Sequence, residues 1–243
     1  MSAATFRFHG ELERFLARQF RGVPFVHEYA RAATLKQAIE SLGVPHTEVG
    51  RLFVNAQPAT LARTVRENDT VEALPHEPGA APFEEPLAFI ADAHMGGLAR
   101  MLRMLGFDAT YDNTLHDPVI AERGAAERRV VLTRDRELLK RRDVLRGCYV
   151  HALKPEDQLR EVARRYSIAA RMQPFTLCLH CNLPLDAATP EAVLVQVPER
   201  IRLQYHQFKH CAGCERIYWE GSHWDRMRSV LAIALDVPIS DMR

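Results

Sequence analysis

The sequence lacks several features that would place it in a special class of protein. Its 243 residues contain no uncharged apolar run of about 18 residues, the length that a membrane-spanning helix needs. Its first residues, MSAATFRFHG, carry no apolar stretch of the kind found in secretory signal peptides. There is no internal repeat at a fixed period and no low-complexity tract. We therefore expect a cytoplasmic protein with no membrane partner.

Strong net charge is also missing. The formal net charge is +1, so bulk charge indicates no particular partner. Hydrophobic residues make up 47% of the chain and charged residues 26%, which is typical of globular proteins and excludes a disordered or collagen-like chain. Local basic stretches at residues 100–103 and 134–142 are candidates for binding a polyanion, although a solvated helix face explains such charges as often.

Residues 1–78 alternate between strand-like and helix-like pieces. TFRFHG and FVHEYA have the two-residue period of strands, and TLKQAIESLG begins with a capping Thr and stops at Gly43. RLFVNAQPA and TVRENDTVEALP supply further strands, with a turn at Asn68 and Asp69. This order predicts a small α+β domain of the β-grasp (ubiquitin-like) type. Residues 79–86, rich in Pro, Gly and Ala, are predicted to be a linker.

The order of LFVNAQPA before VRENDTVEALP resembles the sulfur-carrier proteins of the ThiS/MoaD type. Those carriers act through a C-terminal Gly-Gly, whereas here Pro78, Gly79 and Ala80 continue into more chain. Sulfur transfer is therefore not expected. We expect an interaction or scaffolding role for this domain, with a protein partner.

From residue 87 onward, short apolar runs alternate with helical patterns. We predict strands at 87–91, 108–111 and 130–133, and helices at 98–105 and 118–126. Apolar strands separated by helices indicate a parallel sheet covered on both faces. Ligands of such sheets gather at the carboxyl ends of the strands.

Three acids are predicted to meet at that edge. Asp92 follows the first strand, Asp135 follows VVLT, and Asp117 directly precedes Pro118, which makes it a natural N-cap. Any one of them alone is explained as a turn or cap residue. Three converging carboxylates, however, raise one another's pKa values unless a cation such as Mg²⁺ or Mn²⁺ lies between them. The pattern thus predicts a divalent-cation site.

The stretches FIADAHMGGLARMLRMLGFDATYDN and RRVVLTRDRELLKRR look like the PIN-like ribonuclease domain of the Mut-seven C-terminal family. The resemblance covers about residues 87–159 and implies that Asp92, Asp117 and Asp135 are the catalytic, metal-binding acids. One departure is the absence of the usual Glu-Gly before the strand at 130–133, although Glu127 remains. The fourth acidic ligand is therefore left unassigned.

The chemistry implied is hydrolysis of RNA phosphodiester bonds by a divalent-metal-dependent ribonuclease. Arg100 and Arg134 are candidates for binding phosphate, with a plain surface charge as the alternative for Arg100. Since residues 1–80 contain no catalytic candidate, we expect them to be dispensable for cleavage. The alternative function is a non-catalytic adaptor that binds nucleic acid, with a vestigial acid cluster.

Four of the five cysteines form two Cys-x₂-Cys pairs, Cys178 with Cys181 and Cys211 with Cys214, separated by 29 residues. Four thiolates are the usual ligands of a closed, structural Zn²⁺ site, and a redox function is disfavoured because the pair occurs twice. The aromatic residues nearby either stack on bases or form the core of a small module, and we favour the core. They are Tyr205, Phe208, Tyr218, Trp219 and Trp224.

The resemblance extends to this region, because the same family carries a cysteine module behind its nuclease part. A final helix is expected at residues 222–235, with Ser222 as its cap. The predicted fold class is α/β, with a PIN-like parallel-sheet nuclease core at 87–170, the β-grasp domain before it and a zinc ribbon with the final helix at 171–243. RNA is the expected partner.

Overall fold

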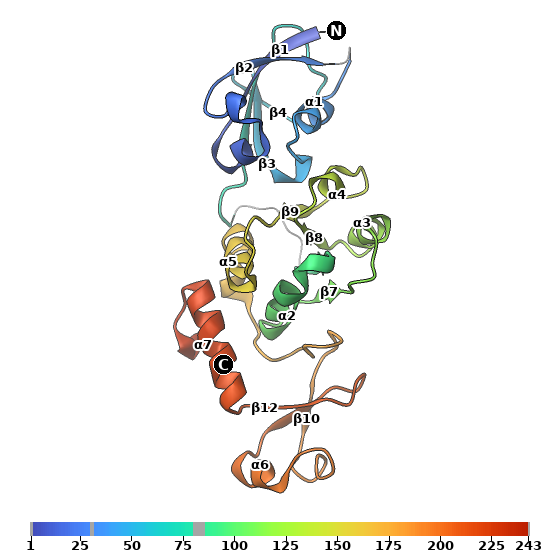
Figure 1. The fold of residues 1–243 in the computed structure, drawn as a ribbon, viewed down its shortest axis with the longest axis vertical. Helices are drawn as coiled ribbons and strands as arrows, with labels where there is room; N and C mark the ends of the chain where they lie inside the picture. The colour runs from blue at the N-terminus through green and yellow to red at the C-terminus, as the bar shows by residue number, and fades with distance from the viewer. Residues whose placement is uncertain (1, 30–31, 80–85, 243) are drawn as a thin grey trace. The chain divides into compact units, whose positions relative to one another are not determined.

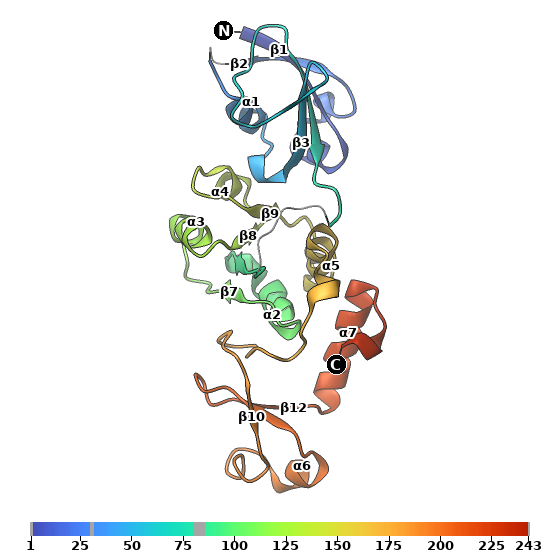
Figure 2. The ribbon, with the colours of Figure 1, turned by 180° about the vertical axis from the view of Figure 1, so that it is seen from behind.

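The computed structural model describes residues 2–29, 32–79 and 86–242. The chain packs as two compact units, shown from two sides in Figures 1 and 2. Unit 1 consists of Met1–Phe83 and His116–Tyr149, and unit 2 of Glu84–Leu115 and Val150–Arg243. Most of the predicted linker, residues 80–85, lies outside the described residues. Within the described ranges, no helix has both the length and the apolar character needed to cross a membrane.

The first part of unit 1 is a five-stranded sheet with the order β2-β1-β5-β3-β4. Strand β1 runs parallel to β5 and antiparallel to β2, while β3 is antiparallel to both β4 and β5. This mixed sheet with one helix, α1, confirms the predicted α+β arrangement. The elements are β1 (Ser2–Phe8), β2 (Phe25–Tyr29), α1 (Leu35–Ser41), β3 (Val49–Val54), β4 (Gln57–Ala59) and β5 (Thr70–Pro75).

Local sequence explains the start of α1. The Gln37 backbone N–H donates to Thr34 Oγ1 at 3.3 Å, and the Thr34 backbone N–H donates to Gln37 Oε1 at 2.9 Å. This reciprocal capping box satisfies two N–H groups that a helix start otherwise leaves without partners. The 3₁₀ helices η1 (Gly10–Phe15), η2 (Arg18–Phe20) and η3 (His46–Glu48) were not predicted.

The predicted turn at Asn68 is present and is held by a buried acid. Asn68 has a φ of 66°, and Asp69 is only 4% exposed. The Asp69 carboxylate accepts hydrogen bonds from Arg63 Nη1, the Arg66 backbone N–H and Asn55 Nδ2, each at 2.8 Å. Burial alone would raise the pKa of Asp69, but these hydrogen bonds lower it overall. The ion pair therefore ties together the loops at one end of the sheet.

The second part of unit 1 is an α/β segment. Strand β8 pairs in parallel with β9, with Val131 opposite Gly147 and Thr133 opposite Tyr149. The predicted strand at 130–133 is confirmed at the same residues, whereas α4 was not predicted. The elements are α3 (Asp117–Ala126), β8 (Val130–Thr133), α4 (Arg136–Lys140) and β9 (Gly147–Tyr149).

The two parts of unit 1 pack directly on each other. The Arg136 guanidinium donates to the Phe15 carbonyl at 3.2 Å and lies 5.1 Å from the centre of the Phe15 ring. The Tyr149 backbone N–H donates to Glu48 Oε1 at 2.9 Å, and Glu48 is only 7% exposed. The β-grasp part therefore accepts hydrogen bonds from α4, the helix that begins directly after Asp135, and from β9. Deletion of residues 1–80 would therefore remove contacts that support α4 and β9, and the dispensability of these residues for cleavage stays a prediction.

We predict that Glu48→Ala lowers the free energy of unfolding by about 1–3 kcal/mol, because the partly buried Tyr149 N–H loses its acceptor. Thermal unfolding measures the effect, and Glu11→Ala, at an exposed position of η1, serves as the matched control. Equal melting temperatures for Glu48→Ala and the wild type would show that the contact does not stabilise unit 1.

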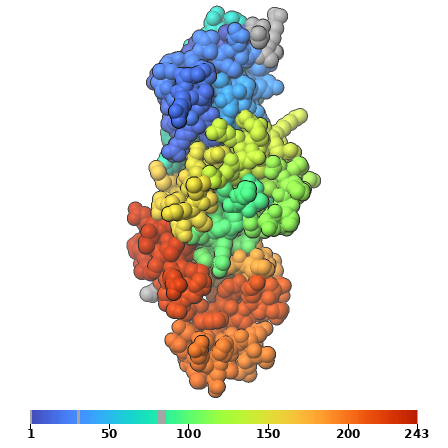
Figure 3. All heavy atoms as spheres, viewed as in Figure 1, coloured from blue at the N-terminus to red at the C-terminus, as the bar shows by residue number. Residues whose placement is uncertain are grey.

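Unit 2 begins with the other part of the predicted nuclease segment. Strand β6 pairs in parallel with β7, with Phe89 opposite Ala109. Helix α5 contacts both α2 and α7, and in Figure 3 the red residues of α7 lie beside the yellow residues of α5. Parallel strands alternating with helices confirm the predicted α/β class. The elements are β6 (Phe89–Ala91), η4 (Ala93–Met95), α2 (Gly96–Met104), β7 (Ala109–Tyr111), α5 (Pro155–Tyr166) and η5 (Ile168–Arg171).

The two glycines that open α2 allow close packing within unit 2. A Cβ atom on Gly96 would lie 2.6 Å from Tyr111 Cζ, and one on Gly97 would lie 2.6 Å from Pro155 Cγ. Both separations are far shorter than a van der Waals contact. The Gly-Gly pair is therefore required for α2 to approach β7 and α5.

The last part of unit 2 is a three-stranded antiparallel sheet with the order β10-β11-β12. Its small core contains Val193, Val197 and Phe208, and Trp224 is buried against Phe175. Core positions are therefore confirmed for Phe208 and Trp224, whereas Trp219 is 36% exposed. The elements are β10 (Asp186–Ala188), α6 (Glu199–Gln204), β11 (Phe208–His210), β12 (Ile217–Trp219), α7 (Ser222–Leu235) and η6 (Ile239–Asp241).

The final helix has the predicted extent, but the prediction of its cap is wrong. Gly221 is the N-cap residue and Ser222 is the first residue of α7. A Cβ on Gly221 would lie 2.8 Å from Trp219 Nε1, so the close approach of the Trp219 ring favours glycine at this position.

Candidate functional site

Asp92 lies at the carboxyl end of β6 and begins a tight turn. Its side chain accepts a hydrogen bond from the Ala93 backbone N–H and so caps η4. The Tyr111 hydroxyl, from β7, donates to the Ala93 carbonyl at 3.0 Å. The turn that carries Asp92 is therefore fixed to the neighbouring parallel strand, and its carboxylate is half-buried.

Asp135 lies just beyond the carboxyl end of β8. Its backbone N–H donates to Thr133 Oγ1 at 2.9 Å, and its Oδ1 accepts from the Glu137 N–H at 2.7 Å. Asp135 is thus the N-cap of α4 and remains exposed. Arg134, the second phosphate-binding candidate, is also exposed in this connection between β8 and α4.

Asp117 is the first residue of α3, and His116 rather than Asp117 is the N-cap. The predicted capping role is therefore wrong by one position, because the helix begins one residue before Pro118. A carboxylate in the first turn is still favoured there by the helix dipole. Its negative charge also helps to raise the pKa of Arg141, for which the main cause is the hydrogen bond to Asp143. Asp117 and Asp135 both belong to unit 1, and Asp92 belongs to unit 2.

Glu127, the remaining candidate for a fourth acidic ligand, is engaged by two guanidinium groups. Arg123 Nε donates to Glu127 Oε1 at 2.8 Å, and Arg129 Nε pairs with Glu127 Oε2. The hydrogen bond from Arg123 is the main cause of a lowered pKa at Glu127. A carboxylate with a cation on each oxygen is a structural ion pair, so we assign it no role as a metal ligand.

The four predicted cysteines form one cluster. The Sγ atoms of Cys178, Cys181, Cys211 and Cys214 all lie within 4.8 Å of one another. Two of these separations are 3.6 Å (Cys178 to Cys214) and 3.2 Å (Cys181 to Cys211). Four sulfurs around a tetrahedral Zn²⁺, with Zn–S bonds of about 2.3 Å, would be about 3.8 Å apart. The donor set and its spacing therefore fit a metal ion.

Both Cys-x₂-Cys pairs have the same backbone turn. In each, the N–H of the first cysteine donates to a carbonyl five residues later, Cys178 to Leu183 at 2.7 Å and Cys211 to Arg216 at 3.0 Å. The residue after the second cysteine has a positive φ in both, 64° at Asn182 and 58° at Glu215. Two similar turns facing each other therefore present four sulfurs inward.

The environment of the cluster favours a thiolate at Cys178. Burial by itself raises its pKa, but hydrogen bonds from the backbone at Cys181 and from the Tyr218 hydroxyl, 3.1 Å away, lower it to about 6. Burial and the neighbouring thiols raise the pKa of Cys181 to about 12. The turn thus stabilises one negative charge, and a bound cation would be needed to stabilise the others.

The first of these turns is joined to α2 and β7, in the first part of unit 2. Arg103, in α2 and only 5% exposed, donates to the carbonyls of Ala109 and His180, each at 2.8 Å. The Asn182 side chain accepts from the Ala109 N–H at 3.1 Å and donates to Asp108. The cysteine turn is therefore hydrogen-bonded to α2 and to the start of β7.

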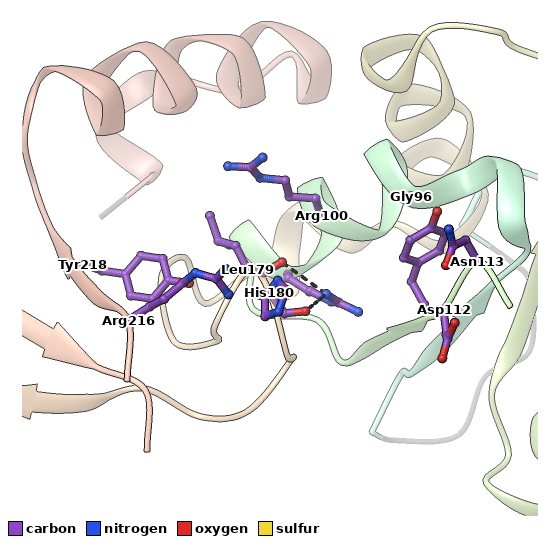
Figure 4. Close-up of a pocket in the computed structure, with 10 residues that line it drawn as sticks. Gly96, Arg100, Asp112, Asn113, Leu179, His180, Arg216 and Tyr218 are labelled. Carbon is purple, nitrogen blue, oxygen red and sulfur yellow. Dashed lines mark hydrogen bonds between the residues drawn. The ribbon is translucent and has the colours of Figure 1, made fainter. Parts of the chain in front are cut away.

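A cavity of about 650 Å³ lies where α2, the end of β7 and the first cysteine turn meet. Figure 4 shows Arg100 from α2 and Arg216 and Tyr218 from the zinc ribbon on one side, and Asp112 and Asn113 toward the other. Arg100 was predicted from the sequence, but Arg216 was not. The lining residues that the structure describes are Gly96, Arg100, Arg103, Tyr111, Asp112, Asn113, Leu179, His180, Arg216 and Tyr218.

Comparison with known proteins agrees with these features. Residues 87–231 match the family model of the Mut7-C RNAse domain, and residues 1–80 match that of the Mut7-C ubiquitin domain. Neither the curated proteins nor the solved structures contain a significant match. The matched RNAse segment exceeds half of the chain and contains all three acids and all four clustered cysteines. The chain therefore belongs to the Mut7-C RNAse family and carries an N-terminal Mut7-C ubiquitin domain.

Proposed function

We propose that this protein is a divalent-metal-dependent ribonuclease. The observation that carries the proposal is the match to the Mut7-C RNAse domain over residues 87–231, within which each candidate acid occupies the end of a strand or the start of a helix. Asp92 follows β6, Asp135 follows β8, and Asp117 begins α3. Strand ends and helix starts are the usual locations of ligand-binding side chains in α/β proteins.

The acids Asp92, Asp117 and Asp135 would hold Mg²⁺ or Mn²⁺, because these hard cations prefer carboxylate oxygens. Such a cation, when bound, lowers the pKa of water and offsets negative charge on a phosphodiester. Of the candidate arginines, Arg134 adjoins Asp135, and its guanidinium suits the binding of a neighbouring phosphate. Asp92 and Asp135 are each preorganised by a hydrogen bond from the backbone, which limits the rearrangement that metal binding requires.

The four cysteines are proposed to bind a structural Zn²⁺ ion. Their use as ligands leaves no coordination position for substrate, so the ion would stabilise the fold rather than react. The contacts of Arg103 and Asn182 would then connect the zinc site with α2 and β7.

The test is incubation of the purified protein with end-labelled single-stranded RNA and single-stranded DNA of the same sequence. Parallel reactions contain Mn²⁺, Mg²⁺ or no added divalent ion, because a strong chelator would also remove zinc. We expect cleavage of RNA only when Mn²⁺ or Mg²⁺ is added. Equal cleavage without added metal would contradict the proposed mechanism, and preferential cleavage of DNA would contradict the proposed substrate.

A second candidate is a non-catalytic adaptor that binds nucleic acid. It is favoured by the capping hydrogen bonds of Asp92 and Asp135, which give both acids a structural reason to be present. This candidate predicts RNA binding without cleavage in all of the metal conditions.

A further inference from the structure

The cavity beside the first cysteine turn has a basic lining that the proposed catalytic acids do not explain. Among the lining residues that the structure describes, three are arginines, one is a histidine and one, Asp112, is acidic. The Asp112 carboxylate accepts from both the backbone N–H and the Oγ1 of Thr114, at 2.8 and 2.7 Å. In Figure 4 it lies away from Arg216 and Tyr218. The part of the cavity next to the zinc ribbon is therefore positively charged.

The arginine side chains of this lining differ in whether they already have hydrogen-bond partners within the protein. Arg103 is buried, and its guanidinium is committed to three backbone carbonyls, those of Ala109, Leu179 and His180. Arg100 and Arg216 are exposed and form no side-chain ion pair or hydrogen bond with the residues that the structure describes. Their charges thus remain available for an anionic ligand.

The position of the two arginines also favours a ligand that extends across two parts of the chain. Arg100 is on α2, in the nuclease part, and Arg216 lies just before β12, in the zinc ribbon. Arg103 and Asn182 hydrogen-bond the first cysteine turn to α2 and β7. The cavity wall that this turn forms is therefore held in place. An anion bound by both guanidinium groups would therefore meet a preformed site.

The cavity lining also contains aromatic side chains. Tyr218 lines the cavity with its hydroxyl fixed 3.1 Å from Cys178 Sγ, and His180 lines it from the cysteine turn. A volume of about 650 Å³ is within the usual range for pockets that take small organic ligands. Single-stranded nucleic acid offers both a phosphate for arginine and an unpaired base for an aromatic side chain. In a duplex the bases are paired and cannot enter such a pocket.

We propose that this cavity binds single-stranded RNA, with Arg100 and Arg216 on its phosphates and an unpaired base beside Tyr218. This site is additional to the proposed catalytic acids. The choice of RNA rests on the proposed function. The zinc ribbon would then contribute directly to substrate binding, because one wall of the cavity belongs to it.

The test is a binding titration of fluorescently labelled single-stranded RNA, without added divalent ion and with the RNA checked for integrity by gel. Arg100→Ala and Arg216→Ala are compared with Arg200→Ala and Arg226→Ala, which remove the same charge at exposed positions outside the cavity. We expect each cavity variant to raise Kd about fivefold to tenfold and the double variant more. The dependence of binding on salt should also become less steep for the cavity variants. Zinc content and melting temperature should not change.

Two results would overturn the proposal. One is RNA binding by the double variant equal to that of the wild type, and the other is an equal loss in the control variants, which would indicate nonspecific attraction. A duplex RNA of the same sequence should bind more weakly and be insensitive to Arg216→Ala; equal sensitivity would contradict the inferred preference for a single strand. Binding is measured without cleavage, so an inactive protein with an intact binding site would refute the proposed ribonuclease activity but not this site.

Discussion

Asp92→Asn is expected to reduce metal-dependent RNA cleavage by at least about 100-fold. The substitution removes one negative charge from the proposed cation site, and the stabilisation supplied by a divalent ion is several kcal/mol, with each tenfold in rate equal to about 1.4 kcal/mol. The amide oxygen of Asn can still accept the hydrogen bond from the Ala93 N–H, so the turn after β6 should be retained. Initial rates of cleavage over a range of Mn²⁺ concentrations measure the effect.

A matched control is Asp186→Asn, which makes the same change at an exposed position of β10. It should cleave RNA at the wild-type rate. Melting with and without Mn²⁺ distinguishes a ligand from a structural residue, since an ion that binds only the folded state raises the melting temperature. Mn²⁺ should stabilise the wild type more than Asp92→Asn. An unfolded Asp92→Asn protein, or one with full activity, would make Asp92 a turn residue only.

Cys178→Ser is expected to have the largest effect on stability. Metal analysis should find about one zinc per chain in the wild type and much less in the variant, because a closed site depends on all four thiolates. The last part of unit 2 has only a small core around Val193, Val197 and Phe208, so loss of the ion should unfold it. Hydrogen exchange over residues 176–219 would localise the change.

Cys148→Ser provides the control for this prediction. Cys148 is buried in β9, is 3% exposed and lies outside the cluster, so its replacement should leave the zinc content unchanged. A Cys178→Ser chain that retains its zinc, or a wild-type chain that is fully folded without zinc, would contradict the assignment.

The elements with strong local signals were predicted best. Strand β8 was found at its observed residues because VVLT is a short, fully buried apolar run. Helix α1 was found through its capping Thr34 and the stop at Gly43, and the cysteine cluster through the spacing of its ligands. In contrast, α5 was not predicted, although Pro155 in its first turn and Arg164 and Arg165 in its last turn are typical helix signals.

Other features depend on contacts between residues that are distant in sequence. The interaction of Glu48 with Tyr149 spans about a hundred residues, so no local pattern indicated that the β-grasp part packs on β9. Arg216 was missed because an arginine beside a cysteine pair has no distinctive spacing; only the fold brings it to the same cavity as Arg100. The cap of α3 was misplaced by one residue because local sequence defines a helix boundary only to within one or two residues.

The most direct test of metal-dependent hydrolysis is mass spectrometry of RNA fragments made in ¹⁸O-labelled water with Mn²⁺. Attack by water breaks one P–O bond of the chain and leaves one solvent oxygen on the phosphate at the cut. We therefore predict one ¹⁸O atom on that phosphate, and cleavage of a strand whose 2′-hydroxyl groups are methylated. A 2′,3′-cyclic phosphate without ¹⁸O, formed at the same rate with and without Mn²⁺, would contradict the account, because it would show attack by the RNA's own 2′-hydroxyl.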